Sequence, residues 1–244
     1  MATEEPILLI EDRGAIRLLT LNRPRQMNAL NAALTSAIIA AVDAADHDSD
    51  VAVLIMAGNE RAFSAGADLK EAEANRGMDA EAARRHGEAS GLLYEIGNRT
   101  DKPIIAAVRG YALGGGCNLA LCTDMVVAGE GAIFGYPEVK RGIAATAVTP
   151  GLVHRIAPKA AFELMTLCDN VPAQRALDLG MINRVVADDA VLDEAFAMAE
   201  ILAGYDQQAL RATKRVFRKS TELTLSQSLV AARETALLVR ANNK

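Results

Sequence analysis

The sequence is poor in the residues that build disulfide frameworks and metal centres. It has three cysteines and three histidines among 244 residues. Cys117, Cys122 and Cys168 are odd in number and lie in apolar surroundings, which is typical of reduced core residues rather than of paired cysteines. None of the histidines has a second ligand-type residue at metal spacing. These shortages argue against a disulfide framework and against a bound metal.

Positive charge and long apolar runs are also scarce. Lys and Arg number 26 against 31 Asp and Glu, so the net charge is −5, and broad attraction to nucleic acid or to an anionic membrane is not expected. No charged start leads into an apolar segment, and no apolar run approaches the ~20 residues that a membrane span needs. We therefore expect a cytoplasmic protein with neither a membrane nor a nucleic acid as its partner.

The apolar residues that are present, 51% of the chain, suffice for a large core. They begin as two short runs on either side of Gly14, which predicts a β-hairpin. Asn31 then precedes a stretch with its apolar residues on one helical face, as in a capped helix. Strand and helix signals go on alternating, which predicts an α/β fold with strands at residues 7–10, 16–21, 51–56, 104–108 and 125–127.

Helix-forming residues dominate the chain beyond Pro158. Thr224 and Gln227 have the spacing of a capping box. They precede an apolar stripe at helical spacing that consists of Leu225, Leu229, Ala232, Ala236 and Val239. Such a stripe must be buried on its own domain or on another subunit, so oligomerisation is an open possibility. We place the core at residues 1–190 and a C-terminal helical region at residues 191–244, with no flexible linker between them.

Two segments rich in small residues follow buried strands. The first is Phe63–Leu69, with Gly66 at its centre, and the second is Leu113–Gly116, with three consecutive glycines. Small residues let backbone N–H groups approach a ligand, and glycines that open a helix leave unpaired amides with the positive end of the helix dipole behind them. The pair therefore predicts a site for an anion or an oxyanion, although glycines that only allow close packing give the same pattern.

Two other kinds of site are disfavoured. Neither segment has the spaced glycines and the Lys-Ser/Thr pair of a phosphate-binding loop, and no GxGxxG precedes a helix. Ser64 lies near a glycine, but the GxSxG motif of serine hydrolases is missing, and His86 and His154 have no assigned partner.

Several motifs follow one another along nearly the whole chain. They are Asn22-Arg23-Pro24 with Asn28-Ala29-Leu30, Phe63 to Lys70, Lys102 to Cys117, Cys122-Thr123-Asp124, Phe134 to Glu138, and Ala173 to Ala176 with Leu179-Gly180. This set closely resembles the enoyl-CoA hydratase/isomerase, or crotonase, superfamily. The resemblance implies a mixed α/β fold, a crotonase-like spiral of ββα repeats, whose C-terminal helical region packs into a homotrimer or a dimer of trimers.

The resemblance also implies a site for an acyl-CoA thioester. The amides of Ala67 and Gly115 would hold the thioester oxygen, where preset donors are each worth roughly 3 to 4 kcal/mol once an enolate forms. Coenzyme A is part of the substrate, and no separate cofactor or metal is required. Arg23 or Arg25 would meet coenzyme phosphates, unless they are solvated loop charges. The implied substrate-binding residues are Arg23, Met27, Ala29, Ala65, Asp68, Leu69, Leu113, Gly114, Pro137 and Thr146.

The chain departs from the hydratases of this family in its acid/base residues. Those hydratases carry two glutamates, whereas this chain has Asn118 at the first position and only Glu138 at the second. An amide holds water but cannot accept its proton near neutral pH. We therefore favour isomerisation of a 3-enoyl thioester to a 2-enoyl thioester, with Glu138 moving the proton from C2 to C4. Hydration by Glu138 and a water held by Asn118 is the alternative, and Thr146 replaces part of the usual water-seating loop.

Two further expectations follow from the resemblance. Residues 70–85 occupy the place of a mobile loop that shapes the acyl pocket, and their polar content agrees with a flexible lid. A non-catalytic or RNA-binding protein of the same fold is an alternative of another class, which the lost glutamate motivates and the acidic net charge opposes.

Overall fold

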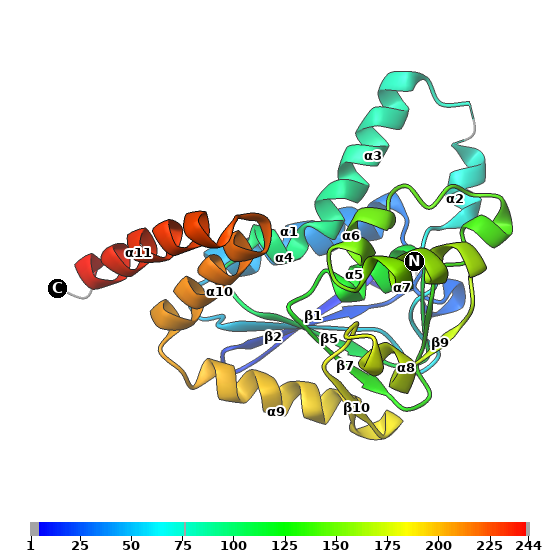
Figure 1. The fold of residues 1–244 in the computed structure, drawn as a ribbon. Helices are drawn as coiled ribbons and strands as arrows, with labels where there is room; N and C mark the ends of the chain where they lie inside the picture. Colours follow the sequence, from blue (N-terminus) through cyan, green and yellow to red (C-terminus); the bar gives the residue numbers. More distant parts are fainter. Residues whose placement is uncertain (1–4, 76, 243–244) are drawn as a thin grey trace.

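Two β-sheets organise the fold in the computed structural model, which describes residues 5–75 and 77–242 (Figure 1). The larger sheet has the strand order β1-β2-β3-β5-β7-β10, and the smaller has the order β4-β6-β8-β9. Neighbouring strands are parallel except for β1 with β2 and β8 with β9. The strands are β1 Leu8–Arg13, β2 Ile16–Leu21, β3 Val53–Ala57, β4 Ala62–Ser64, β5 Ile104–Val108, β6 Tyr111–Leu113, β7 Met125–Gly129, β8 Ile133–Gly135, β9 Val171–Pro172 and β10 Arg184–Val186.

The chain visits the two sheets in turn. Strand β3 of the larger sheet is followed by β4 of the smaller one and then by helices, and the order returns with β5, β6 and α5 and with β7, β8 and α6. This confirms the predicted spiral of ββα units. The helices are α1 Ala32–His47, α2 Leu69–Ala74, α3 Ala80–Tyr94, α4 Ile96–Arg99, α5 Gly115–Leu121, α6 Thr149–Val153, α7 Pro158–Leu167, α8 Ala173–Asp178, α9 Val191–Ala203, α10 Gln207–Glu222 and α11 Leu225–Asn242, with short 3-10 turns η1 Pro24–Gln26, η2 Val139–Arg141 and η3 Asp188–Ala190.

Both faces of the larger sheet are covered, so its central strands are apolar at every position. Val53 and Ile55 of β3 belong to the apolar cluster that includes α9, whereas Leu54 and Met56 belong to the cluster that includes α1 (Figure 1). Helix α9 therefore closes the core although it follows residue 190. The division of the chain at that residue stays a prediction.

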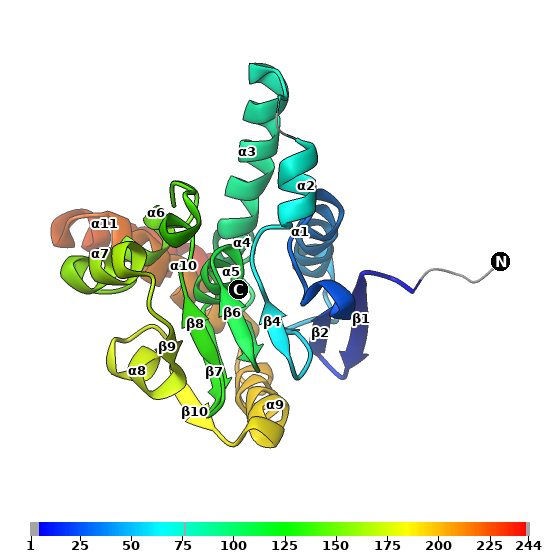
Figure 2. The ribbon, with the colours of Figure 1, turned by 90° about the vertical axis from the view of Figure 1, so that its right-hand side faces the viewer.

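The segment expected to be a mobile loop is largely helical. Residues 70–85 form most of α2 and the first part of α3, and α3 projects from the body of the protein (Figures 1 and 2). Both helices have aspartate caps, because Asp68 accepts hydrogen bonds from the amides of Lys70 and Glu71, and Asp79 accepts one from the amide of Ala82. The caps and the alanine content explain why this polar stretch folds as helix.

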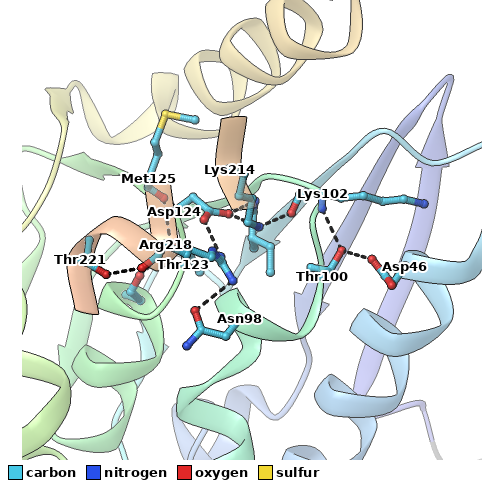
Figure 3. A network of polar contacts seen from close by, with 12 residues as sticks. Asp46, Asn98, Thr100, Lys102, Thr123, Asp124, Met125, Lys214, Arg218 and Thr221 are labelled. Carbon is cyan, nitrogen blue, oxygen red and sulfur yellow. Dashed lines mark hydrogen bonds and ion pairs between the residues drawn. The ribbon is translucent and has the colours of Figure 1, made fainter. Parts of the chain in front are cut away.

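A buried polar network fixes α10 to the core. Asp124 accepts hydrogen bonds from the Lys214 ammonium, the Arg218 guanidinium and the amide of Ile104, each at 2.7 Å (Figure 3). Arg218 also donates to Asn98 at 3.0 Å. Burial lowers the pKa of Lys214 to about 8, so its charge depends on this carboxylate.

Replacing Asp124 with Ala should destabilise the protein by about 3 to 5 kcal/mol, because it leaves a buried ammonium, a guanidinium and an amide without their acceptor. Urea unfolding measures the change. The matched control is Asp101→Ala, which removes the exposed partner of Arg215 on the same helix and should cost less than about 1 kcal/mol. Equal losses in the two variants would contradict a special role for Asp124.

The last helix, α11, keeps much of its apolar surface exposed. Thr224 and Gln227 form the predicted capping box, since the amide of Thr224 donates to Gln227 and the amide of Gln227 donates to Thr224. Ala231 and Thr235 are buried, but several larger side chains are not: Leu225, Leu229, Val230, Leu237 and Leu238. Within the described part of the chain, no helix is both long and apolar enough to cross a membrane.

Candidate active site

Three neighbouring strands bring the predicted site residues together. Strands β4, β6 and β8 are parallel and lie side by side in the smaller sheet (Figure 2). Their carboxyl ends lead into residues 65–69, 114–118 and 136–138. Segments far apart in the sequence therefore meet at one edge of a sheet, the place where parallel sheets commonly bind ligands.

The two glycine-containing segments touch each other. Gly66 has φ +90°, and a Cβ atom there would lie 2.6 Å from the carbonyl oxygen of Leu113 and 3.2 Å from the amide nitrogen of Gly115. The amides of Ala67 and Gly115 donate no hydrogen bond to any residue that the structure describes. Two uncommitted N–H groups on touching segments can serve one ligand oxygen.

The carboxylate of Glu138 lies against the residue before Gly115. Gly114 has φ +52° and ψ −122°, and a Cβ atom there would lie 2.6 Å from Oε1 of Glu138. Oε2 is buried and has no hydrogen-bond partner among the described residues. Burial raises the pKa of Glu138 above its ordinary value. A carboxylate held in this way is poised to exchange a proton with a bound ligand.

Asn118 is fully buried with its side-chain amide unpaired. Neither Oδ1 nor Nδ2 has a hydrogen-bond partner in the described part of the chain. Gly151 of α6 makes room for this amide, because a Cβ atom at Gly151 would lie 2.1 Å from Oδ1. Asn118 also lies one helical turn after Gly114, and its backbone N–H donates a hydrogen bond to the carbonyl of Gly114 at 3.0 Å. Buried unpaired polar atoms cost roughly 1 to 3 kcal/mol each, so the position suits a polar ligand group or a water.

The early loop is fastened to the segment after β4. The amide of Ala65 donates to the carbonyl of Met27 at 2.9 Å, and Arg23 forms an ion pair with Asp68 at 2.8 Å and donates to the carbonyl of Ala29. Five predicted binding residues are thus brought together. The guanidinium of Arg23 therefore has protein partners, whereas Arg25 is exposed.

A family model described as enoyl-CoA hydratase/isomerase matches residues 11–241. The chain belongs to this family. A probable mitochondrial enoyl-CoA hydratase of Dictyostelium discoideum is 40% identical over 220 residues, which are 90% of this chain and 78% of that protein. A 2,3-dehydroadipyl-CoA hydratase of Escherichia coli (strain K12) is 36% identical over 235 residues, 96% of this chain and 90% of that protein. A crystal structure of an enoyl-CoA hydratase from Mycobacterium smegmatis has a TM-score of 0.91 at 31% identity and covers 96% of this chain and 91% of that chain.

The match to the enoyl-CoA hydratase/isomerase family model confirms the resemblance that the motifs indicated, and the similar crystal structures confirm the fold class. The protein is therefore an enzyme of the crotonase superfamily that acts on an acyl-CoA thioester. The alternative of a non-catalytic protein with the same fold is wrong. The roles of individual residues stay predictions.

Other members of the predicted set lie around this family site. Leu113 and Pro137 line a cavity of about 300 Å³, whose lining also includes Lys140 and Arg141. Leu69 is half exposed. Thr146 lies exposed in the turn before α6, and its part in the site stays a prediction.

Two residues near the site carry no signal in the sequence. Tyr94 ends α3, and its hydroxyl lies against Gly115, while Gly151 contacts the amide of Asn118. Both line a larger cavity of about 640 Å³ between α4, α5, α6 and α10. Neither belongs to a motif, and their importance follows only from the contacts that the fold creates.

Proposed function

We propose that the enzyme transfers protons on an enoyl-CoA thioester, with Glu138 as its single acid/base and the amides of Ala67 and Gly115 as donors to the thioester oxygen. One observation carries the proposal: the carboxylate of Glu138 rests on Gly114, directly before the Gly115 amide. A thioester whose oxygen is held there has its α-carbon close to that carboxylate.

Isomerisation is the reaction that this arrangement supports best. Hydrogen bonds to the thioester oxygen make C2 of a 3-enoyl thioester acidic, and the ionised Glu138 removes a proton from it. The resulting dienolate carries its charge on the oxygen, where the two amides stabilise it. Glu138 then returns the same proton to C4, which moves the double bond to C2 and restores the carboxylate. Coenzyme A is part of the substrate, and the proposal needs no further cofactor.

Hydration of a 2-enoyl thioester is a second candidate. The unpaired amide of Asn118 favours it, because a water there would find both a donor and an acceptor. The relatives from Dictyostelium discoideum and Escherichia coli are both named hydratases, and the second name specifies 2,3-dehydroadipyl-CoA. In this reaction the water oxygen bonds to C3 while Glu138 takes one of its protons, and Glu138 then returns that proton to C2 of the enolate.

The acyl chain and the quaternary structure belong to the same proposal. The 640 Å³ cavity would receive the acyl chain, since its lining includes Tyr94, which touches Gly115, and Gly151, which touches Asn118.

A homotrimer or a dimer of trimers would cover the exposed apolar side chains of α11. The cytoplasmic location stays a prediction.

Replacing Asn118 with Leu separates the two reactions. Leu has a similar size but neither holds water nor donates a hydrogen bond, so hydration of a 2-enoyl thioester should fall at least about tenfold. Isomerisation of a 3-enoyl thioester by the same variant should stay within about threefold of the wild-type rate. Both rates are measured with purified protein and thioesters of several lengths. If the wild-type enzyme acts on neither class of thioester, the proposed function is wrong.

A further inference from the structure

The side chain of Tyr94 reaches the point where the two predicted oxyanion segments meet. A Cβ atom added to Gly115 would lie 2.4 Å from the hydroxyl oxygen of Tyr94 and 3.5 Å from Cδ1 of Leu30. Leu30 in turn forms a parallel bridge with Ala67. The phenol of Tyr94 therefore comes from a third segment of the chain. It touches Gly115, which carries one of the two amides, and it lies near Leu30, which is paired with Ala67, the residue that carries the other amide.

The hydroxyl of Tyr94 is available to a ligand. It makes no hydrogen bond to any residue in the described ranges. The ring itself is partly buried and packs against the apolar core, at the end of α3. A fixed ring with a free hydroxyl is a preorganised hydrogen-bond donor.

The surroundings of Tyr94 also keep its proton in place. Burial raises the pKa of Tyr94, and the nearby carboxylate of Glu138 raises it further. The hydroxyl is therefore neutral at every pH at which the enzyme is expected to work. It can donate a hydrogen bond throughout, but it cannot serve as a base.

We infer that Tyr94 donates a third hydrogen bond to the thioester oxygen, beside the amides of Ala67 and Gly115. The inference rests on the proposed function, because negative charge develops on this oxygen only when the thioester enolises. Tyr94 keeps its proton during the reaction, and Glu138 alone carries a proton between carbon atoms. An additional donor makes C2 more acidic, which compensates in part for the second carboxylate that Asn118 replaces.

Replacing Tyr94 with Phe tests the inference, since it removes the hydroxyl and keeps the ring. We expect kcat to fall by about 10- to 100-fold with KM unchanged within about twofold, the pattern of an interaction made mainly in the transition state. The pH at which the rate rises should be the same as in the wild type, because Tyr94 does not titrate in that range. A bound thioester conjugated to an aromatic ring should absorb at a longer wavelength than in water, and this red shift should be smaller in Tyr94→Phe.

The matched control is Tyr111→Phe, which removes the hydroxyl of an exposed tyrosine at the start of β6 and should keep the wild-type kcat and red shift. An unchanged red shift in Tyr94→Phe would overturn the inference, whatever happens to kcat, because it means that the oxygen has lost no donor. If the wild-type enzyme turns over no enoyl thioester, this result would instead contradict the proposed function. The red shift of the bound thioester would still test Tyr94 in that case.

Discussion

Replacing Glu138 with Gln lowers kcat on enoyl thioesters by about 10²- to 10⁴-fold, the range expected when a general acid/base is removed. The amide has the same shape as the carboxylate and can still rest on Gly114, but it cannot accept a proton. Because Asn118 offers no second carboxylate, no neighbouring group is expected to rescue the reaction. Steady-state rates with 2-enoyl and 3-enoyl thioesters measure the loss.

The same substitution should not destabilise the protein. Burial raises the pKa of Glu138, so between its unfolded and folded pKa values the folded state binds more protons than the unfolded state. The free energy of unfolding therefore falls as the pH rises through this window, and the ionised carboxylate is a cost at neutral pH. Glu138→Gln removes this cost and should unfold at the same or a higher temperature than the wild type.

Two measurements decide whether Glu138 acts as proposed. Glu130→Gln, in the exposed turn between β7 and β8, should keep full activity and serves as the control. The wild-type kcat/KM should rise with pH at a value above the ordinary carboxyl range, because the base must be ionised. A Glu138→Gln enzyme with wild-type kcat would contradict the proton-transfer account.

The sequence predicts those parts of the structure that depend on local patterns. The cap at Asn31 holds, since its side chain accepts a hydrogen bond from the amide of Leu34 at 2.9 Å. The hairpin at Gly14 forms with an antiparallel register, and the predicted strand at 51–56 is observed as β3, with bounds shifted by one or two residues. Such features are set by residues close together in the chain, and so they can be predicted before the fold is known.

Contacts between distant segments were beyond prediction. Arg23 and Asp68 read as two separate ligand contacts in the sequence, yet they neutralise each other in an ion pair across two loops. The contact of Tyr94 with Gly115 arises because α3 ends next to α5, which no spacing of residues reveals. The motifs named the segments that the smaller sheet brings together, but only the packing of these segments shows which polar atoms are left without a partner.

Replacing Gly114 with Ala should cause the second large loss of activity. The backbone at Gly114, with φ +52° and ψ −122°, is one that residues with a side chain rarely adopt, and holding Ala there costs about 1 to 3 kcal/mol. The added methyl group would also lie 2.6 Å from Oε1 of Glu138, so the carboxylate must move. A displacement of about 1 Å can reduce the rate by about 100-fold, and we expect kcat to fall by at least that factor.

Gly14→Ala is a control that separates backbone strain from displacement of the Glu138 carboxylate, the two effects expected in Gly114→Ala. Gly14 has φ +58°, but no other group lies within 4 Å of an added Cβ atom, so the substitution brings backbone strain without a collision. It should lower the unfolding temperature and leave kcat unchanged. If Gly114→Ala loses stability but keeps its rate, the position of the carboxylate does not matter, and Glu138 cannot be the proton carrier. If it loses both, the lack of a side chain at residue 114 serves the fold and the chemistry together, because the conformation that places the Gly115 amide also gives Glu138 its position.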